Sequence, residues 1–414
     1  MKSENILNLS VKGIAFCETE GNLDDYLDFS LKDQSLRNTV SSVLFTYFRK
    51  KTLIDHILKN LINKRPSAFL RRALSVAFVQ ILYHTGIEKF KVTDVTVSYV
   101  KIKEGKFSAN FVNAVLRNFI RQLEEKDTVE QLTAAVRSVP DFLYERWVNN
   151  YSKDDADKIV NAIDSRPEFT FRSTVEIDQN DFENLKIRKI SFPWTDEFYI
   201  ADEPTEILNS HLLKEGSIYI QDPAASFFSS LVKDIQPNKI LDYCSAPGGK
   251  AIILSSLFPD SKITATDRSQ VRLERTRQNF CRMKIKNAEA INMEEFEKRC
   301  HKESFDFLLL DVPCSNTGVI RHRPDIMWKF NKETLKNNAS LQKEILQKAV
   351  NYLAKSGYLL YSTCSIELEE NEIQIENFLS DNPGFSLLKK KILLPSVTHD
   401  GAFAALLTNG NILK

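Results

Sequence analysis

The sequence predicts two architectures in one chain, an all-α bundle followed by an α/β sheet. From about Ser35 to Glu125 the apolar residues recur with helical spacing, and strand signals are few. From Lys239 onward, short apolar runs alternate with amphipathic helices, the pattern of parallel βαβ units. With 414 residues the chain is long enough for roughly two to four domains, so each architecture can have its own core.

The helical half is predicted from three apolar patterns. In AFLRRALSVAFVQILYHTG, pairs of apolar residues recur every four positions between Phe69 and Leu82. Ser67 is placed to begin this helix and Gly86 to end it. Similar patterns at 40–61 and 107–123 predict further helices. Such helices, each with one apolar face, pack as a bundle, which we assign to residues 1–140.

A connecting region is predicted at residues 141–235. Two short helices are expected between Asp141 and Ser165, the second capped by Ser152. Beyond them, 169–175 (FTFRSTV) and 217–221 (SIYIQ) alternate polar and apolar residues as strands do. This region is therefore expected to hold linker helices and a small α/β subdomain.

The last part of the chain, residues 236–414, is predicted to be a doubly wound α/β sheet. Its five strand candidates are KILDYC (239–244), KITATD (262–267), AEAIN (288–292), FDFLLLD (305–311) and YLLYSTC (358–364). Helical segments separate them, as parallel strands require.

Charge is distributed unevenly along the chain. The net charge is only +1, but residues 31–140 contain 19 lysines and arginines against nine acidic residues. Residues 141–414 contain 35 against 40. A basic block is typical of a nucleic-acid-binding surface. A solvated helical surface with spare lysines explains it equally well, so charge alone leaves both interpretations open.

Membrane, metal and secretory functions are not expected. The longest apolar runs, 73–83 and 305–312, are shorter than the roughly 20 residues that cross a bilayer. Met1–Thr19 lacks the basic start and long apolar stretch of a secretory signal. Six cysteines, none at CxxC spacing, predict neither a disulfide framework nor a zinc site. We expect a cytoplasmic protein that binds no metal.

Polar or reactive residues end all five predicted strands. They are Cys244, Asp267, Asn292, Asp311 and Cys364. Ligands of open parallel sheets bind outside the carboxyl ends of the strands. Any one of these residues is explained as well by a hydrogen bond to a neighbouring loop. All five together predict a site at this edge.

The first strand leads through CSAPGGK (244–250) directly into a helix. Pro247, Gly248 and Gly249 form a turn without side-chain bulk, which lets a ligand approach the backbone N–H groups at the helix start. The turn is not the GxGxxG fingerprint of dinucleotide binding. Asp267 is placed to accept hydrogen bonds from ribose hydroxyls, although capping the helix that begins near Ser269 is also compatible with its position.

Two cysteines follow the ends of the fourth and fifth strands. Cys314 and Cys364 are each flanked by small polar residues, and neighbouring strands would direct both into one pocket. A reactive pair is the favoured interpretation. For Cys17, Cys281 and Cys300 we expect inert thiols.

Three segments around these residues resemble a known family. CSAPGGK, DVPCSNTGVIRHRPDIMW (311–328) and YSTCSIELEEN (361–371) are similar to the signature blocks of the RsmB/Sun (Fmu) bacterial 16S rRNA cytosine-5 methyltransferases, in the NOL1/NOP2/NSUN superfamily. NFVNAVLRNFIR (110–121) resembles a segment of the NusB-like RNA-binding domain at the front of the bacterial members. Together these resemblances imply a NusB-like bundle, a small RNA-binding subdomain and a Rossmann-like catalytic domain.

The chain departs from the family pattern at three places. RHRPDI replaces the order RRHPDI, Asn292 stands where an aspartate is common, and the tail has DGAFAALL instead of DGFFYAKL. Asn292 retains a hydrogen-bond acceptor for adenine but loses the charge, so weaker cofactor binding is expected.

The resemblance implies roles for the site residues. Cys364 is the nucleophile that attacks carbon 6 of cytosine, and Cys314 assists release; DNA enzymes use the Pro-Cys residue for attack, so the chemistry alone leaves the order open. Asp311 holds the cytosine amine, and Lys250 offsets charge on the ring. S-adenosylmethionine is expected at Cys244, Ser245, Ala246, Pro247, Gly248, Gly249, Lys250, Asp267, Asn292 and Asp311.

The family also implies the partner. The expected substrate is 16S ribosomal RNA or a small-subunit assembly intermediate, bound by a monomer. Arg321, His322 and Arg323 are candidates for phosphate contacts near a flipped base, or else solvated loop charges. Alternatives are a non-catalytic RNA-binding or ribosome assembly factor and an enzyme for another RNA such as tRNA; a nicotinamide dehydrogenase lacks its GxGxxG motif.

Overall fold

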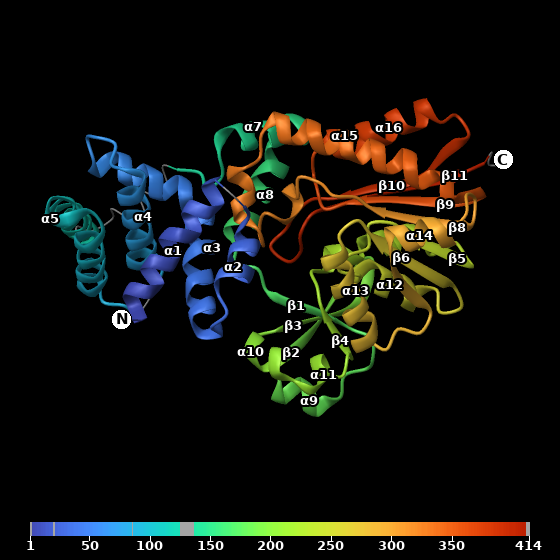
Figure 1. Cartoon of the computed structure of the whole chain (residues 1–414), viewed down its shortest axis with the longest axis horizontal. Helices are drawn as coiled ribbons and strands as arrows, with labels where there is room; N and C mark the ends of the chain where they lie inside the picture. The colour runs from blue at the N-terminus through green and yellow to red at the C-terminus, as the bar shows by residue number, and fades with distance from the viewer. Residues whose placement is uncertain (1, 20, 85, 125–135, 411–414) are drawn as a thin grey trace. The chain divides into compact units, whose positions relative to one another are not determined.

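The structure is a computed structural model that describes residues 2–19, 21–84, 86–124 and 136–410 (Figure 1). It divides into two compact units, each made of two stretches of chain. The first unit comprises Met1–Asp164 and His322–Lys329, and the second comprises Ser165–Arg321 and Phe330–Lys414.

The first unit is helical, which confirms the predicted all-α bundle. Its α-helices are α1 (Lys2–Thr19), α2 (Leu23–Ser30), α3 (Gln34–Leu61), α4 (Ala68–Tyr83), α5 (Lys89–Glu124), α7 (Asp141–Asn150) and α8 (Lys153–Asp164). The predicted caps are present, because the Leu70 amide donates to Ser67 Oγ at 3.2 Å and the Asp155 amide to Ser152 Oγ at 3.0 Å. Gly105, with φ +86°, interrupts α5.

A short segment from the second half of the sequence belongs to this helical unit. The 3₁₀ helix η3 (Pro324–Trp328) packs on the bundle, where Trp328 Nε1 donates to the Phe48 carbonyl at 2.9 Å. The Lys51 ammonium lies 4.4 Å from the centre of the Trp328 ring. Asp325 is buried and accepts from the Leu23 amide at 3.1 Å. These contacts anchor residues 322–329 in the first unit.

The second unit contains two sheets. The smaller sheet has the order β2-β3-β1-β4, with antiparallel neighbours. Its strands are β1 (Phe169–Ser173), β2 (Ile187–Phe192), β3 (Thr195–Ala201) and β4 (Ile218–Ile220). Both strands predicted in this region are confirmed, whereas β2 and β3 were not predicted.

The larger sheet has seven strands in the order β10-β11-β9-β8-β5-β6-β7. They are β5 (Lys239–Asp242), β6 (Lys262–Asp267), β7 (Ala288–Asn292), β8 (Phe305–Asp311), β9 (Leu353–Thr363), β10 (Phe385–Leu393) and β11 (Ala402–Asn409). The five predicted strands are parallel neighbours, as expected. The sheet is mixed, however, because β11 runs antiparallel to both β9 and β10. Residues 394–401 connect β10 to β11 without a helix, which permits an antiparallel return.

Helices cover both faces of the larger sheet. Alternate residues of β8 show this, because Phe307 and Leu309 pack with α12 and α13, whereas Leu308 and Leu310 pack with α14, α15 and α16. The helices are α12 (Gly249–Leu257), α13 (Gln270–Arg282), α14 (Met293–Arg299), α15 (Lys332–Ala349) and α16 (Glu372–Asp381). This is the predicted doubly wound, Rossmann-like arrangement.

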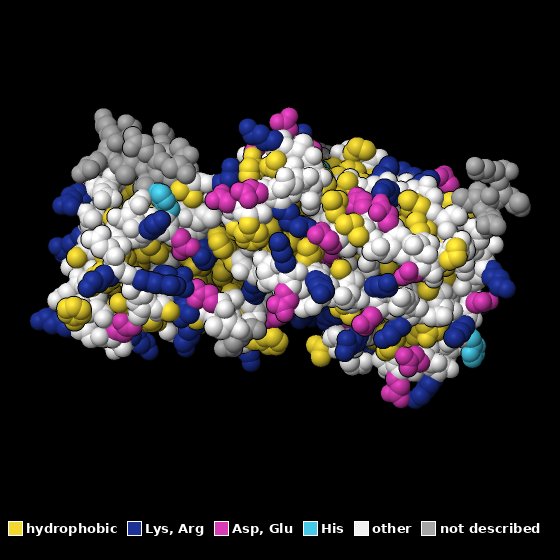
Figure 2. All heavy atoms as spheres, turned by 90° about the horizontal axis from the view of Figure 1, so that it is seen from above, with side chains coloured by type: hydrophobic (Ala, Val, Ile, Leu, Met, Phe, Trp, Pro, Cys, Tyr) yellow, Lys and Arg dark blue, Asp and Glu magenta, His cyan; other side chains and the backbone are white. Residues whose placement is uncertain are grey.

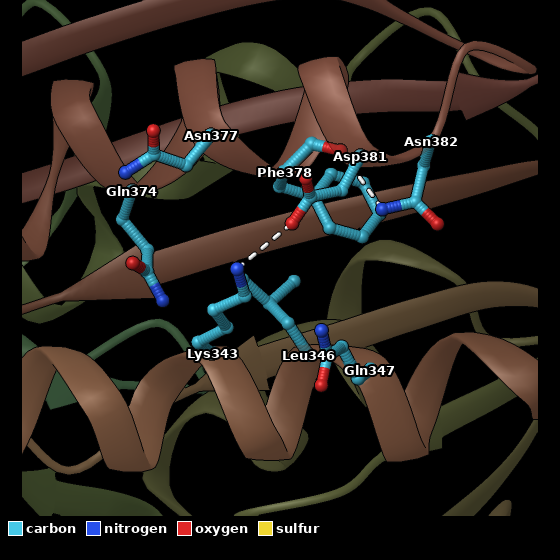
Figure 3. A pocket seen from close by; sticks show the side chains of 8 residues that line it. All are labelled: Lys343, Leu346, Gln347, Gln374, Asn377, Phe378, Asp381 and Asn382. Atoms are coloured by element: carbon cyan, nitrogen blue, oxygen red, sulfur yellow. Dashed lines mark hydrogen bonds and ion pairs between the residues drawn. The ribbon is translucent and has the colours of Figure 1, made fainter.

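Helices α15 and α16 lie side by side and are joined by an ion pair between Lys343 Nζ and Asp381 Oδ2 at 2.8 Å (Figure 3). The hollow between them measures about 10 Å³, which is too small for a nucleoside. None of the helices within the described ranges has the length and apolarity needed to cross a membrane.

Candidate active site

The five predicted strand-end residues meet at one edge of the larger sheet. Strands β9, β8, β5, β6 and β7 are adjacent and parallel, so their carboxyl ends lie along the same edge. In this spatial order the edge carries Cys364, Asp311, Cys244, Asp267 and Asn292. The two cysteine segments therefore occupy one end of the row, and the residues predicted to bind a nucleoside occupy the other.

The loop after β5 is shaped by its own backbone. The Ser245 amide donates to the Thr266 carbonyl at 3.0 Å, which holds the loop against β6. Gly248 has φ +96°, and a Cβ there would lie 2.8 Å from Thr276 Cγ2. Gly248 caps α12 without any side-chain bond, so the first amides of the helix face the loop. These open amides and the missing side-chain bulk fit a nucleoside cofactor with a charged tail.

Asp267 supports this loop from the end of β6. Its buried carboxylate accepts from the Ala246 amide at 3.2 Å, from the Ser269 amide at 2.8 Å and from Arg272 Nη2 at 3.1 Å. The local hydrogen bond to Ser269 and the candidate ribose site therefore share one carboxylate. A carboxylate has about four lone-pair positions, and three donors already use the Asp267 carboxylate. Two ribose hydroxyls can bind as well only if the exposed Arg272 side chain moves away.

Two other residues of the row have defined local roles. Asn292 Oδ1 accepts from the Glu295 amide at 2.8 Å and caps α14, which leaves a second lone pair for an adenine amine. Burial raises the pKa of Cys244 above its usual range, so this thiol stays protonated. Cys244 therefore contributes to the loop as a small apolar residue.

The sequence analysis missed Asp242, the last residue of β5. Its side chain is fully buried beneath the loop, and burial raises its pKa to about 7, from the ordinary 3.8. A signal for this residue is present in the sequence. Asp242 directly follows the apolar strand residues Ile240 and Leu241, and a carboxylate inside a buried strand is unusual.

Asp242→Asn is expected to stabilise the protein increasingly as the pH rises from 4 to 7. Because the folded-state pKa lies above the unfolded-state value, the buried carboxylate costs stability once the pH exceeds the unfolded-state pKa, and the cost levels off above pH 7. The gain is at most a few kcal/mol, since one pKa unit corresponds to about 1.4 kcal/mol. Denaturant midpoints of variant and wild type at pH 4, 6 and 8 measure it. Parallel pH profiles would contradict the expectation.

Lys250 and Asp311 form an ion pair at the centre of the row. Lys250 Nζ lies 2.7 Å from Asp311 Oδ1. Burial lowers the pKa of Lys250, but the adjacent Asp311 carboxylate outweighs burial, so the net pKa is raised. Lys250 therefore remains an ammonium beside Asp311.

The two cysteines are in contact. Their Sγ atoms are 3.4 Å apart, and Cys364 Sγ lies 2.9 Å from Asn316 Oδ1. Asn316 Nδ2 donates to the Cys314 carbonyl at 3.0 Å, which turns the amide oxygen toward the Cys364 thiol. The hydrogen bond with Cys364, together with burial, raises the pKa of Cys314 well above its usual range. The structure thus brings the two thiols together, and their reactivity stays a prediction.

A buried polar network fixes the two cysteine segments. The Glu370 carboxylate accepts from the Ser315 amide at 2.8 Å and from Ser315 Oγ at 2.5 Å, and burial raises its pKa. Ser365 Oγ lies 3.1 Å from Ser315 Oγ and 3.2 Å from Thr317 Oγ1. Each cysteine is thus adjacent in sequence to a serine of this network. Sequence reasoning missed Glu370, although it lies within the third signature block.

Gly318 brings three segments together near the cysteines. Its amide donates to the Cys364 carbonyl at 2.9 Å, and its carbonyl accepts from the Gly401 amide at 2.8 Å. A Cβ at Gly318 would lie 2.7 Å from both the Cys364 and Gly401 carbonyl oxygens. Only glycine allows this approach.

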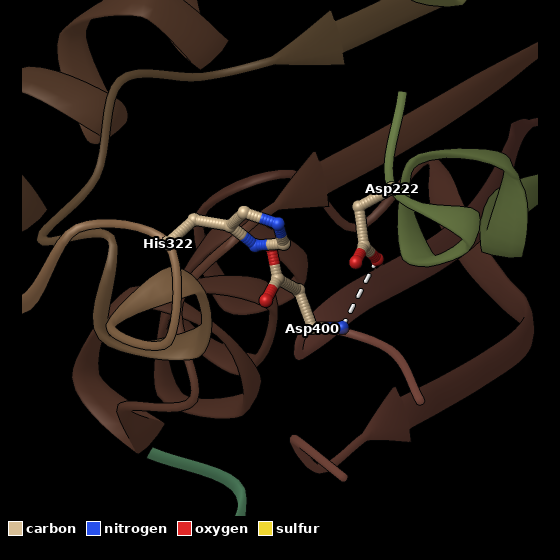
Figure 4. Close-up of side chains that lie close together, drawn as sticks. All are labelled: Asp222, His322 and Asp400. Carbon is tan, nitrogen blue, oxygen red and sulfur yellow. Dashed lines mark hydrogen bonds between the residues drawn. The ribbon is translucent and has the colours of Figure 1, made fainter. Parts of the chain in front are cut away.

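Arg321 does not contact phosphates, contrary to one sequence-based interpretation. Its side chain is 1% exposed, with Nη2 2.9 Å from Asp222 Oδ2 and Nε 3.4 Å from Asp400 Oδ1. The Asp400 amide also donates to Asp222 Oδ1 at 3.0 Å, so the two acidic residues are joined directly (Figure 4). Two carboxylates inside the unit require a buried cation between them, which explains why the guanidinium is not available to solvent. Arg323 pairs with Asp24 at 2.9 Å.

Comparison with known proteins identifies the family. A family model described as 16S rRNA methyltransferase RsmB/F matches residues 231–404, and a NusB family model matches residues 9–121. The ribosomal RNA small subunit methyltransferase B of Shewanella oneidensis is 32% identical over 311 residues, covering 72% of this chain and 70% of that protein. The chain belongs to the RsmB family.

Two further comparisons agree with the sequence-based resemblance, which is confirmed. The protein of the same name from Citrobacter koseri is 30% identical over 405 residues, covering 94% of this chain and 93% of its own. The crystal structure of a protein designated PH0851 has the same fold, with a TM-score of 0.76, 23% identity and 98% of each chain covered. The chain is an S-adenosylmethionine-dependent ribosomal RNA methyltransferase with a NusB-like N-terminal domain.

Proposed function

We propose that this chain methylates carbon 5 of a specific cytosine in 16S ribosomal RNA through a covalent cysteine–RNA adduct. The observation that carries the proposal is the contact of two thiols, 3.4 Å apart, at the same sheet edge as the Lys250–Asp311 pair. Carbon 5 of cytosine is a weak nucleophile, so its methylation needs covalent activation of the ring. A non-catalytic RNA-binding factor has no use for this arrangement.

Cys364 acts as the nucleophile in this scheme. Its thiol loses a proton to solvent, the sulfur forms a bond to carbon 6, and the displaced electron pair makes carbon 5 nucleophilic. Asn316 holds the sulfur in place before attack, because its amide oxygen accepts from the thiol. When bound, S-adenosylmethionine supplies the electrophilic methyl group.

Cys314 acts in release. Once its own proton has passed to water, the thiolate removes the hydrogen from carbon 5, the C–H electrons restore the ring double bond, and the bond between carbon 6 and Cys364 breaks. The contact between the two sulfurs, 3.4 Å apart, places Cys314 beside the adduct that Cys364 forms, where a base is needed to remove the proton.

Asp311 and Lys250 hold the base. Asp311 accepts from the exocyclic amine of cytosine, a contact that uracil cannot reproduce. Lys250 remains charged and offsets negative charge that develops on the activated ring. Their ion pair sets both groups in position before RNA binds.

The cofactor is assigned to the loop and the strand ends beside it. Asp267 binds the ribose and Asn292 the adenine amine, while the open amides at the start of α12 face the charged tail. The complete set of proposed cofactor residues is Cys244, Ser245, Ala246, Pro247, Gly248, Gly249, Lys250, Asp267, Asn292 and Asp311. Two features support this assignment. The start of α12 has no side-chain cap, and Gly248 leaves the space beside it free of a side chain.

The proposed setting follows from the same scheme. The enzyme works as a monomer in the cytoplasm, needs no metal, and acts on 16S rRNA or a small-subunit assembly intermediate. Residues 1–140 and the subdomain within 141–235 bind RNA, and residues 236–414 carry out the chemistry. Six free cysteines suit a reducing compartment.

Bisulfite sequencing of ribosomal RNA from a strain lacking the gene tests the proposed function. One cytosine in 16S rRNA should lose its methyl mark, and the wild-type gene should restore it. An unchanged 16S rRNA, or a lost mark in tRNA instead, would refute the substrate assignment.

Asp267→Ala is expected to weaken S-adenosylmethionine binding by about tenfold or more. The variant loses an acceptor for ribose hydroxyls and the bond that holds the Ala246 amide, and a hydrogen bond to a charged group contributes about 1.5–3 kcal/mol. Isothermal calorimetry measures the change. Arg272→Ala is the control, because it removes a competing partner of the same carboxylate and should leave affinity equal or higher. Unchanged binding in folded Asp267→Ala would exclude Asp267 from the site.

A further inference from the structure

A short segment in the middle of α5 is exposed along its whole length. Residues 101–107 (KIKEGKF) contain three lysines and one acidic residue, and no side chain among them is buried. Phe107 is 89% exposed and Ile102 is 71% exposed. A phenylalanine with nearly its whole ring in solvent is unusual for a residue type that normally packs in the core.

The segment is exposed because of Gly105. This residue, at φ +86° and ψ −179°, interrupts the helix. Phe107 comes after the interruption, and its side chain does not continue the buried apolar face of the helix. On the N-terminal side Tyr99 and Val100 are buried, and on the C-terminal side Ala109 is buried. The packed parts of the helix therefore leave the 101–107 segment exposed to solvent as a corner.

A second basic segment lies against this corner. Ser67 Oγ donates to Glu104 Oε1 at 3.1 Å, so the loop before α4 contacts this corner, and Lys64 and Arg65 precede Ser67 in that loop. Both of these cations are exposed. Among the residues that the structure describes, none forms an ion pair with Lys64, Arg65, Lys101, Lys103 or Lys106. In Figure 2, the surface over α4 and α5 carries more Lys and Arg side chains than Asp and Glu side chains.

We propose that this surface, formed by residues 64–65 and 101–107 and called here the α5 corner, binds a single-stranded segment of ribosomal RNA. An unpaired base stacks on the Phe107 ring, while the surrounding lysines contact the flanking phosphates. Aromatic side chains bind bases in this way without reading their sequence, and cations beside them follow the backbone. The inference rests on the proposed function, because it assumes that the helical unit meets the substrate.

The composition of the corner favours RNA over a protein partner. Stable protein interfaces bury about 800 Å² on each partner around a centre depleted in charge. Here the two segments carry five exposed cations and two exposed apolar side chains, and the single acidic residue is already bonded to Ser67. A polyanion with flat apolar bases is complementary to such a surface, and an apolar protein face is not.

Phe107→Ala in the full chain is expected to weaken binding of 16S rRNA fragments by about fivefold or more, because stacking on one aromatic ring contributes about 1–3 kcal/mol. Phe107→Trp should retain affinity. The matched control is Phe29→Ala in the same unit, since Phe29 is 79% exposed but adjoins Asp24, Asp25 and Asp28. That variant should bind like the wild type. Filter binding at several salt concentrations measures all three.

The lysines provide an independent readout. Lys103→Ala and Lys106→Ala should each reduce the slope of log affinity against log salt by up to about one, whereas Phe107→Ala should leave the slope unchanged. Equal affinities of Phe107→Ala and Phe29→Ala would overturn the inference. So would a Phe107→Ala defect confined to association with a ribosomal protein or a second copy, detected by sedimentation. If the wild type itself fails to bind or methylate 16S rRNA, the proposed function fails instead.

Discussion

Cys364→Ala is expected to abolish methyl transfer, by roughly 10⁴-fold or more, the scale on which loss of a nucleophile acts. Without this sulfur no bond to carbon 6 can form, and carbon 5 is not activated. RNA affinity should be largely kept, because the binding groups lie elsewhere. Transfer of a labelled methyl group to 16S rRNA, together with filter binding, measures both properties.

Cys314→Ala is expected to fail differently. The variant still has the attacking sulfur, so it should form the adduct and transfer the methyl group, then stall because nothing removes the proton from carbon 5. Incubation with RNA and cofactor followed by a denaturing gel should show a slow-migrating protein–RNA band for this variant and none for Cys364→Ala.

The two variants control each other, because the sulfurs they remove are in contact. A slow band with Cys364→Ala and none with Cys314→Ala would reverse the assigned roles. If neither variant gave a band while both lost activity, the covalent scheme would be unsupported. Treatment with a protease should release the RNA from a genuine adduct.

Arg321→Ala is expected to destabilise the second unit by about 3–5 kcal/mol. Removing one partner of a buried ion pair leaves uncompensated charge, and here Asp222 and Asp400 would both lose the guanidinium. Hydrogen exchange measured on peptides from residues 165–321 and 330–414 reports the loss in that unit directly.

Arg323→Ala is the matched control for Arg321→Ala. Arg323 is 51% exposed and pairs with Asp24 on the surface, so its removal should cost less than about 1 kcal/mol. If Arg321→Ala exchanged no faster than Arg323→Ala, the buried cluster would not stabilise the unit.

The sequence predicted those features that depend on neighbours along the chain. Ser67 and Ser152 each cap a helix by accepting from the amide three residues ahead. The five parallel strands end at polar residues, and these residues identify the edge of the sheet that carries the candidate site. Adjacent strands then bring Cys314 and Cys364 together, as expected from the βαβ order. Local hydrogen-bond chemistry and hydrophobic period were sufficient in these cases.

Features that depend on distant partners were not predictable. Arg321 pairs with Asp222, which lies 99 positions earlier in the sequence. Because this partner cannot be recognised from the sequence, the buried arginine could not be distinguished from one that binds phosphate. Strand β10 was missed because Lys389, Lys390 and Lys391 interrupt its alternation of polar and apolar residues. The strand tolerates these lysines because it lies at the edge of the sheet. Asn316 was not proposed as a site residue because its contact with the thiol depends on a backbone turn at φ +60°.

The position of β11 determines how late in folding the cysteine site is completed. This strand lies between β9 and β10, and the Gly401 amide just before it donates to the Gly318 carbonyl beside the cysteines. Contacts between residues far apart in the sequence form slowly, because loop-closure entropy is lost before the contacts stabilise the chain. The helices and the β10–β11 pair can therefore form first, and the cysteine site becomes complete only when β11 pairs with β9.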